Sequence, residues 1–457
     1  MIRAETGQIA IIGGGGREHV LAEQYAKDDK VKALAVLPGN DFIKYDIEQR
    51  FGKSVEINPS VILKNPDSIL AGLGDTDYDL VDVAQDNAIA GDIAGHVRRE
   101  GGLAFAPDAN AGRLESDKSF FRSLGSRAGI PQPQNVTVYD DRGLEEYLDT
   151  LPEESAFYAK ASGLAEGKGA VSAKDKYELR LRVQQLRKDF PQAAEAIVIE
   201  EWLRNFDGTP GEEFSAFFAT DGLDSVYLGT AVDYKRANDN DTGENTGSMG
   251  SNSPTNIMSG DLLSLTKDSI VNPLLNQMTQ EDLDYQGVLY VSGMRTRDAS
   301  GRTKVNVIEM NSRLGDPEAQ VVLPGMTNSY RDFAMAVATR DLGGITVNHD
   351  GRSRVAVTGA SRGYPGNYDQ VKGKEVTGLE DVRSTNGTTV YGAGMELRDN
   401  KWLAKGGRLF YVVGEGDSTQ DARERAYEGM SYIDVDGENL HHRSDIGMKD
   451  IRRTNIS

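Results

Sequence analysis

The sequence VNVIEMNSRLGDPEAQ, residues 305–320, carries the pattern from which the rest of the chain is interpreted. Its first seven residues are mainly β-branched or apolar and contain no Gly or Pro, which predicts a strand. Because side chains alternate between the two faces of a strand, Glu309 and Asn311 should point the same way. Two oxygen ligands at this spacing suit Mg²⁺, which proteins hold through one or two carboxylates and substrate phosphates. Arg313 follows as a fork-shaped donor for a carboxylate or phosphate, although a strand ending in a polar turn would look the same.

Composition narrows the class of protein. The 457 residues are enough for two to four domains, and 38% hydrophobic with 27% charged residues is typical of a globular protein. A net charge of −20 disfavours nucleic acid and anionic membranes as partners, so local Lys, Arg and backbone N–H groups must meet any anionic substrate. The absence of Cys excludes disulfides, thiolate metal sites and Cys nucleophiles. No apolar run reaches membrane length, and we expect a cytoplasmic protein.

The amino-terminal region reads as an α/β domain. Residues 8–20, QIAIIGGGGREHV, predict a strand, a Gly-rich turn and a helix whose N-terminus attracts an anion. The spacing is not that of a dinucleotide fingerprint, because the third glycine position is Glu18 or His19. We therefore expect one phosphorylated group here, with Arg17 as a contact, although a purely structural turn fits equally well. Further strand and helix signals up to about residue 110 predict a parallel sheet.

A glycine-rich hairpin is predicted at residues 155–173, SAFYAKASGLAEGKGAVSA. Lys160 ends its first strand and Lys168 lies in the loop. The pattern differs from a P-loop, which needs GxxxxGK[ST] before a helix. Such a hairpin can fold over triphosphate oxygens as a lid, or it can be an ordinary mobile hairpin.

The remaining segments alternate between strands and polar stretches. A strand at residues 197–203 ends in acids and an aromatic, and residues 233–256 form a long polar loop that is either a linker or functional. A helix at 260–278 precedes the hairpin that delivers Glu309. After residue 330, strands such as RVAVTGA and RLFYVVGEG and a helix at 419–430 predict a smaller α+β domain.

Taken together, these stretches resemble the phosphoribosylamine–glycine ligases of the ATP-grasp superfamily over essentially the whole chain. The motifs that carry the resemblance are IIGGGGREH, PGN, KASGLAEGKG, DYKRANDNDTGENTGSMG, VIEMNSRLGDPEAQ, SRGYPGNY and SDIGMKDIRR. The resemblance implies an N-terminal parallel-sheet α/β domain (1–112), an ATP-grasp domain pair (113–330) with a mobile lid (about 130–198) and a small C-terminal α+β domain (331–457). It also implies the reaction in which ATP, glycine and 5-phosphoribosylamine give ADP, phosphate and glycinamide ribonucleotide through glycyl phosphate.

The resemblance further implies roles for individual residues. It gives the ATP-binding residues as Lys118, Lys160, Gly163, Gly167, Lys168, Gly169, Glu200, Leu203, Glu213 and Lys235. Glu309 and Asn311 would hold Mg²⁺ or Mn²⁺. Asp233, Arg313 and Asp316 are the catalytic candidates that position glycine. The phosphoribosyl substrate would contact Gly14, Gly15, Gly16, Arg17, Asn40, Thr246, Gly247 and Met249.

Some positions depart from the family pattern. Ala84-Gln85-Asp86 stands where the family usually has Gly-Pro-Glu, and GVLYVSGM on the neighbouring strand offers no further metal carboxylate. Two other functions stay open: another ATP-grasp ligase such as a carboxylating purine enzyme, and a nucleotide-binding sensor without turnover. Arg313 could also serve only a structural ion pair with Asp316 or Glu318. We expect small-molecule partners only, no nucleic acid or membrane, and a monomer.

Overall fold

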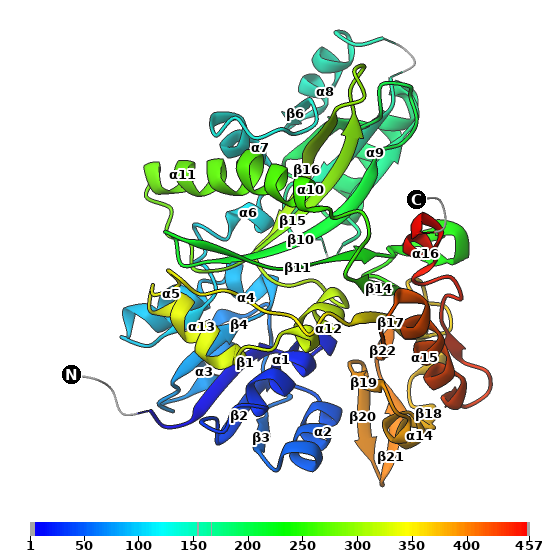
Figure 1. Cartoon of the computed structure of the whole chain (residues 1–457). Coiled ribbons are helices and arrows are strands. Elements are labelled where there is room, and N and C mark those ends of the chain that lie inside the picture. Colours follow the sequence, from blue (N-terminus) through cyan, green and yellow to red (C-terminus); the bar gives the residue numbers. More distant parts are fainter. Residues whose placement is uncertain (1–4, 153–154, 166, 455–457) are drawn as a thin grey trace.

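Five parallel strands form the first sheet, as the βα alternation of the sequence predicted (Figure 1). The structure is a computed structural model that describes residues 5–152, 155–165 and 167–454. The strands run in the order β3-β2-β1-β4-β5. Their bounds are β1 Gln8–Gly13, β2 Ala33–Pro38, β3 Ser54–Ile57, β4 Leu80–Val83 and β5 Ala104–Phe105. The helices between them are α1 Gly16–Ala26, α2 Asp41–Phe51, α3 Pro66–Leu73, α4 Asp86–Ala90 and α5 Ile93–Arg99.

Helices cover both faces of this sheet because its central strand is apolar on both sides. Ile9 and Ile11 of β1 pack with residues of α1 and α2, whereas Ala10 and Ile12 pack with residues of α3 and α5. The carboxyl ends of the parallel strands therefore stay open, which is where ligands of open α/β sheets bind.

A second sheet combines strands from the middle and from the carboxyl-terminal part of the chain. Its nine strands follow the order β16-β15-β10-β11-β14-β17-β22-β19, with β24 beside β17. The bounds are β10 Glu212–Thr220, β11 Ser225–Asp233, β14 Gly250–Ser253, β15 Gly287–Arg297, β16 Thr303–Asn311, β17 Ser353–Ser361, β19 Thr388–Gly392, β22 Arg408–Gly416 and β24 Leu440–His441. Helices α10 (Gly260–Thr266) and α11 (Asn272–Gln280), joined by a π-helical turn, cover the strands at one end with a shared apolar core.

A small separate sheet stands at the top of the molecule in Figure 1. We call it the lid sheet; its order is β6-β9-β7-β8, and it has its own apolar core with two helices. The bounds are β6 Asn135–Val138, β7 Phe157–Ala161, β8 Ala170–Ala173, β9 Ile197–Glu201, α8 Asp141–Leu148 and α9 Lys176–Asp189. Strands β7 and β8 pair antiparallel, so the predicted strand–Gly-loop–strand hairpin is confirmed over the described residues, with Glu166 of the loop outside them.

The carboxyl-terminal region is α+β, as predicted. Strands β20-β21-β18-β23 form a further sheet beside β17, β19 and β22. The remaining bounds are β18 Glu375–Thr377, β20 Met395–Arg398, β21 Lys401–Ala404, β23 Asp434–Val435, α6 Arg113–Ser116, α7 Lys118–Arg127, α12 Glu318–Val322, α13 Tyr330–Ala338, α14 Leu379–Ser384, α15 Thr419–Tyr432 and α16 Met448–Thr454.

The expectation of a polar loop at residues 233–256 was wrong. The segment contains a hairpin of β12 (Arg236–Asn238) and β13 (Thr242–Asn245), followed by β14, which lies inside the large sheet. The cause is a distant side chain: the buried Arg443 donates from Nη1 to the carbonyl of Arg236 at 3.1 Å and to Asp241 at 3.0 Å. Local composition does not reveal such a partner.

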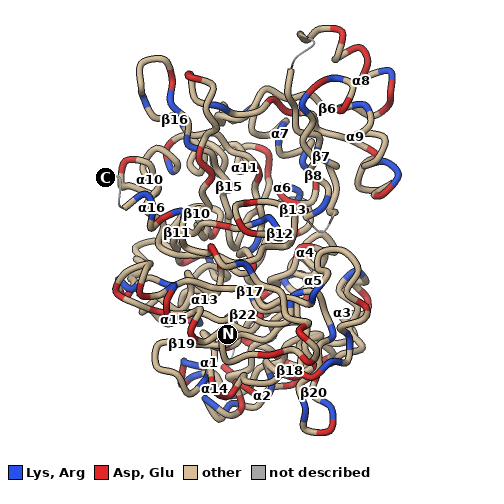
Figure 2. The backbone as a smooth tube through the Cα atoms, turned by 90° about the vertical axis from the view of Figure 1, so that its right-hand side faces the viewer, with Lys and Arg blue, Asp and Glu red and all other residues tan. Residues whose placement is uncertain are grey.

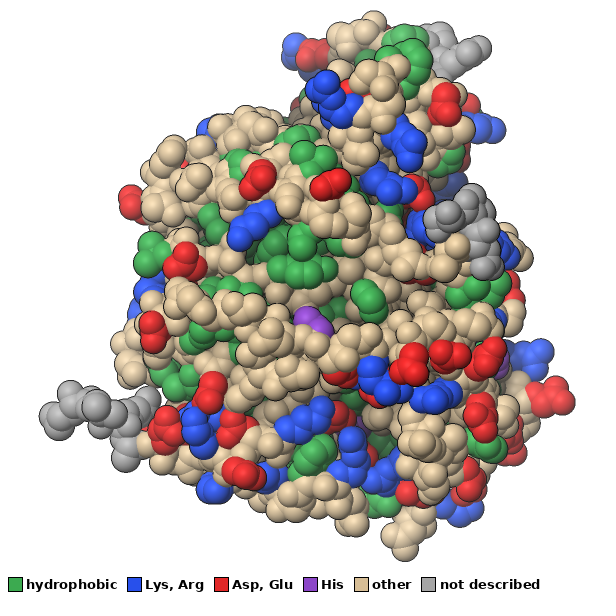
Figure 3. Space-filling model, viewed as in Figure 1, with side chains coloured by type: hydrophobic (Ala, Val, Ile, Leu, Met, Phe, Trp, Pro, Cys, Tyr) green, Lys and Arg blue, Asp and Glu red, His purple; other side chains and the backbone are tan. Residues whose placement is uncertain are grey.

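Charges of both signs are distributed along the whole chain (Figure 2) and are intermingled on the face drawn in Figure 3. Among the residues that the structure describes, no helix combines the length and the apolarity needed to cross a membrane.

Candidate active site

A cavity of about 540 Å³ lies between the lid sheet, the end of β16 and the carboxyl end of the first sheet. It brings together residues that are far apart in the sequence. The predicted site residues that line it are Arg17, Lys118, Lys160, Gly167, Gly169, Glu200, Asp233, Lys235, Thr246, Gly247, Glu309, Asn311, Arg313 and Asp316. The other predicted site residues are absent from its lining: Gly14, Gly15, Gly16, Asn40, Gly163, Lys168, Leu203, Glu213 and Met249.

A β-bulge aims Glu309 and Asn311 into this cavity. The pairing of β15 with β16 shifts at Ser292/Gly293, so that Ser292 faces Glu309 and Gly293 faces Val307, with Ile308 as the extra residue. Val305 and Val307 lie in the apolar core, and strict alternation would send Glu309 to the core with them. The extra residue reverses the phase, so Met310 is buried instead while Glu309 and Asn311 line the cavity.

Cations surround Glu309. Lys235 Nζ lies 3.6 Å from its Oε1. Burial alone would raise the pKa of Glu309, but Lys235, Lys160 and Lys118 together lower it to about 2. Lys118 is the opposite case, because burial is the largest influence and lowers the pKa of its ammonium, against the attraction of Glu309. The site therefore contains a permanently ionised carboxylate among several cations, which is an environment suited to phosphate groups and a divalent cation.

Glu200 anchors the lid sheet to the rest of the cavity. Its carboxylate accepts from Lys160 Nζ at 2.7 Å and from Arg122 Nε at 2.7 Å, and all three side chains are buried. Burial would raise the pKa of Glu200, but the two cations hold it below its ordinary value. Lys160 also donates to the carbonyl of Ile308 at 3.1 Å, and Arg122 donates to the same carbonyl. The bulge residue is thus the point where β7, β9, β16 and α7 meet.

Arg313 has a different partner from the ones considered from the sequence. Its Nη2 lies 2.9 Å from Glu115 Oε1 of α6, and no ion pair of Arg313 with Asp316 or Glu318 occurs among the described residues. Burial raises the pKa of Glu115, which Arg313 partly offsets, and Ser312 N–H donates to Glu115 at 2.8 Å. Arg313 therefore lines the cavity with part of its fork already bound to Glu115.

Asp316 belongs to a contact with the carboxyl-terminal region. Tyr411 Oη donates to its Oδ2 at 3.1 Å, and Gln320 donates to its Oδ1 at 2.6 Å. Arg408 of β22 donates to the Asp316 carbonyl at 2.7 Å and also to the Gly247 carbonyl. Arg408 thereby joins the predicted glycine contact to the predicted phosphoribosyl contact.

Asp233 and Glu318 bring two further carboxyl groups into the cavity. Asp233 ends β11 with Lys235 Nζ 3.9 Å from its Oδ2, and burial raises the pKa of Asp233. Glu318 begins α12 and accepts from Tyr290 Oη at 2.9 Å. Burial, reinforced by Asp233, raises the pKa of Glu318 to about 7.

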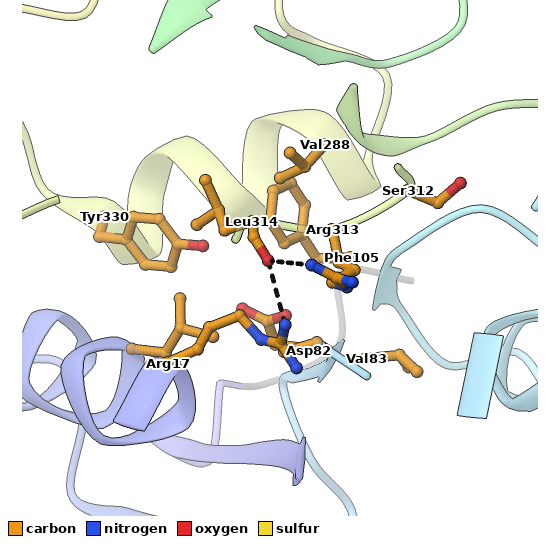
Figure 4. A pocket seen from close by; sticks show the side chains of 11 residues that line it. Arg17, Asp82, Val83, Phe105, Val288, Ser312, Arg313, Leu314 and Tyr330 are labelled. Carbon is orange, nitrogen blue, oxygen red and sulfur yellow. Dashed lines mark hydrogen bonds between the residues drawn. The ribbon is translucent and has the colours of Figure 1, made fainter. Parts of the chain in front are cut away.

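The Gly-rich turn after β1 lies at the edge of the cavity, and its helix N-terminus is partly occupied by the chain itself. Glu18 accepts from the N–H of Gly15 at 2.6 Å. Arg17 donates to Glu18 at 2.8 Å and to the carbonyl of Leu314 at 3.1 Å. Arg313 donates to the same carbonyl, so the two guanidinium groups converge on the Leu314 carbonyl from α1 and from the segment after β16 (Figure 4).

The structure does not gather the predicted phosphoribosyl contacts in one cavity. Gly14 and Asn40 line a separate cavity of about 210 Å³ between the first sheet and the carboxyl-terminal region, and Asn40 donates to the carbonyl of Gly14 at 2.8 Å. Thr246 and Gly247 line the large cavity. Met249 is fully buried and bonds only through its backbone to Tyr234 and Thr358, so the structure gives it a packing role.

Sequence reasoning missed several residues of the site. Arg122, Glu115, Glu318, Tyr290 and Arg408 all line the cavity. Arg122 lies four residues after Lys118 on α7, so helical spacing could have suggested it. Glu318 lies inside the motif at residues 305–320, two residues after Asp316, so its place in the sequence could also have suggested it. Glu115, Tyr290 and Arg408 are placed by long-range packing and carry no local signal.

Comparisons with known proteins agree with this arrangement. The family model of the ATP-grasp (A) domain of phosphoribosylglycinamide synthetase matches residues 116–319, and the models of its N and C domains match residues 7–115 and 354–449. A phosphoribosylamine–glycine ligase from Nostoc sp. is 30% identical over 97% of this chain and 99% of its own length. One from Listeria innocua is 31% identical over 96% of this chain and 99% of its own length.

A larger protein and a solved structure are also similar to this chain. The trifunctional purine biosynthetic protein adenosine-3 from Gallus gallus is 34% identical over 97% of this chain, but the chain spans only 42% of that protein. A crystal structure of a phosphoribosylamine–glycine ligase from Thermotoga maritima has a TM-score of 0.77 at 25% identity, covering 96% of this chain and 99% of that one. Because two full-length relatives are at least 30% identical and three successive domain models match, the chain belongs to the phosphoribosylglycinamide synthetase (phosphoribosylamine–glycine ligase) family of ATP-grasp enzymes.

Proposed function

We propose that the 540 Å³ cavity catalyses the ATP-dependent ligation of glycine to 5-phosphoribosylamine, giving glycinamide ribonucleotide, ADP and phosphate. A carboxylate acylates an amine at neutral pH only after its oxygen becomes a good leaving group, and phosphorylation by ATP to glycyl phosphate supplies this. The observation that carries the proposal is the ionised Glu309 among Lys118, Lys160 and Lys235, beneath a glycine hairpin. No protein nucleophile is needed, so positioning and charge neutralisation account for the catalysis.

The decisive assay measures ADP formation with each substrate omitted in turn. We expect net release of ADP into solution only when both glycine and phosphoribosylamine are present. Replacement of glycine by bicarbonate distinguishes the carboxylating alternative, and ADP formation at all excludes a sensor without turnover.

The phosphates of ATP have candidate partners on three sides of the cavity. Lys118 and Lys160 supply ammonium groups, and Gly167 and Gly169 line the cavity from the hairpin. A Cβ on Gly167 would lie 3.9 Å from the carbonyl of Thr246, so the hairpin tip reaches across to the opposite wall. Glu200 lines the same cavity beside Lys160. Lys168, Gly163, Leu203 and Glu213 stay predictions without a place in the cavity lining.

The residues at the end of β16 fit a divalent cation. Glu309 is ionised, and Asn311 adds a carbonyl oxygen on the same face. Within the described residues no group of three or more acidic or His side chains could hold a metal ion by itself, so phosphate oxygens and water would complete the shell of Mg²⁺ or Mn²⁺. A cation bound there would neutralise charge on the phosphates. Small molecules would be the only partners, and the monomeric state and the cytoplasmic location stay predictions.

Arg313→Lys tests the glycine site. Lysine keeps the charge but loses the fork, and Glu115 already occupies part of that fork. Loss of one charge-assisted hydrogen bond to the glycine carboxylate should raise the KM for glycine about 10- to 100-fold, with a lower kcat and little change in the KM for ATP. Steady-state kinetics beside a thermal melt measure this, with the exposed Arg302→Lys as control. A lower melting temperature with an unchanged glycine KM would show that Arg313 does not bind glycine and has only a structural role through its ion pair with Glu115.

Hydrogen exchange tests the hairpin as a lid. Gly167 and Lys168 are exposed at its tip, and Gly167 has a φ of +76°, so the loop has little stability of its own. Exchange of the described loop amides should slow when ATP and Mg²⁺ bind. The exposed β15–β16 turn at residues 298–301 serves as the control and should not respond. Equal protection of both turns would indicate general tightening and not closure of a lid.

A further inference from the structure

Glu318 is a cavity carboxylate to which the proposed function gives no role. It is 3% exposed and lines the cavity from the first turn of α12. Tyr290 Oη donates to its Oε1 at 2.9 Å and itself lies 2.9 Å from Ser215 Oγ. Because the tyrosine hydroxyl has one proton, Ser215 must donate to Tyr290 while Tyr290 donates to Glu318. In this series of hydrogen bonds from Ser215 through Tyr290, the carboxylate of Glu318 is the final acceptor.

The backbone beside Glu318 is shaped around its carboxyl group. A Cβ on Gly315 would lie 2.4 Å from the carboxyl carbon and from both oxygens of Glu318. Any side chain at residue 315 would therefore displace the carboxyl group. Together with Tyr290, this fixes Glu318 in one place at the cavity wall.

The charges around Glu318 leave it free to exchange a proton near neutral pH. Burial is the largest influence on its pKa and, together with Asp233, raises it to about 7 against the opposing effects of Tyr290 and Lys235. Two guanidinium groups, Arg313 and Arg408, also face it. A carboxyl group balanced in this way is matched to general base catalysis at physiological pH.

We propose that Glu318 accepts the proton that the amine of phosphoribosylamine loses when its nitrogen attacks the carbonyl carbon of glycyl phosphate, an inference that rests on the proposed function. The C–N bond forms with the nitrogen lone pair, and the bond between the carbonyl carbon and the phosphate oxygen breaks. The proton moves from nitrogen to the Glu318 carboxylate and then to the departing phosphate, which leaves as hydrogen phosphate. Atoms and charge balance without any further reactant.

The other carboxylates of the cavity are already engaged. Cations hold Glu309 ionised, which makes it a very weak base. Glu200 lies between Lys160 and Arg122, and Glu115 is paired with Arg313. Asp316 accepts from Gln320, Tyr411 and Arg408. Asp86, which also lines the cavity, accepts from the side chain of Gln85 and from the N–H of Asn87. Only Asp233 competes, because its buried Oδ1 has no hydrogen-bond partner among the described residues, so it serves as the rival in the test.

Glu318→Gln tests the proposal, because the amide keeps the shape and still accepts from Tyr290. Two rates are compared. The first is complete product formation, which we expect to fall about 10²- to 10⁴-fold. The second is glycine-dependent positional isotope exchange in ATP without the amine, which reports only formation of glycyl phosphate and should stay close to wild type. An equal loss of both rates would place Glu318 in the first half-reaction and overturn the proposal.

The pH profile supplies a second readout. The kcat/KM for phosphoribosylamine should fall on the acid side of about pH 7 in the wild type as Glu318 is protonated. Glu318→Gln should lack this limb, whereas Asp233→Asn should keep it but move it to lower pH, because the charge of Asp233 raises the pKa of Glu318. Tyr290→Phe removes a hydrogen-bond donor to the ionised form of Glu318, so it raises the pKa of Glu318 and should move the limb to higher pH. This variant tests the proposal independently if Glu318→Gln does not fold. Titration of the amine is common to all variants and cancels in the comparison.

Different outcomes would refute the role of Glu318 and the proposed ligase function. A limb that survives in Glu318→Gln, or that disappears in Asp233→Asn, would assign the proton to another group and refute the role of Glu318. Absence of glycine-dependent isotope exchange in the wild type would instead refute the proposed function itself.

Discussion

Glu309→Gln is expected to abolish turnover, with kcat reduced by at least about 10³-fold, since a bound metal supplies several kcal/mol of charge stabilisation. The neutral amide keeps the shape of Glu309 but loses the charge that Lys235, Lys160 and Lys118 stabilise. ATP should still bind weakly, because those lysines and the glycine hairpin remain.

Calorimetry of ATP binding and turnover over a range of Mg²⁺ concentrations measure the two effects separately. Glu56→Gln is a matched control, because Glu56 is also a strand carboxylate but is exposed on β3, away from the cavity. Near-normal turnover of a folded Glu309→Gln enzyme at limiting Mg²⁺ would remove Glu309 from the metal site.

Arg122→Leu is expected to destabilise the protein and weaken ATP binding together. Arg122 is 3% exposed and binds Glu200 as well as the carbonyls of Val307 and Ile308. Removing one partner of a buried ion pair costs about 3–5 kcal/mol, and here two carbonyls also lose a donor. Lys160 would remain as the sole cation on Glu200 and would be drawn toward it, which should raise the KM for ATP.

Unfolding in denaturant and the KM for ATP are the two measurements. Arg127→Leu is the control on the same helix, because Arg127 forms an exposed ion pair with Glu281 whose loss costs about 0–1 kcal/mol. If both Arg variants lose the same stability, the connection between the lid sheet and β16 does not depend on Arg122.

Local patterns were enough to predict most of the architecture. The Gly-rich turn before α1, the hairpin of β7 and β8 and the strand that ends at Asn311 each have a signature within about 20 residues. The family resemblance then predicted which of these segments lie around one cavity. Most of the lysines and acidic residues that it indicated do line that cavity.

The details that escaped prediction depend on contacts distant in sequence. The bulge at Ile308 leaves no mark in the composition of β16, yet without it Glu309 would face the core. The ion pair of Arg313 with Glu115 and the hydrogen bond from Arg443 to the carbonyl of Arg236 in β12 likewise join segments far apart in sequence, which local sequence patterns do not predict. Met249 shows the converse, because a residue inside a recognisable motif is packed away from the cavity.

The continuous nine-stranded sheet has a consequence for how the polypeptide can be divided. Strand β14 comes from the middle of the chain, yet it pairs with β11 on one side and with β17 of the carboxyl-terminal region on the other. All four of its residues, Gly250–Ser253, are buried. A chain cut at residue 330 would leave this strand as a bare edge with unpaired N–H and C=O groups, which invites self-association. The boundary that the sequence predicts there does not separate two independently folding units, so the two regions should melt in a single transition and neither should survive alone.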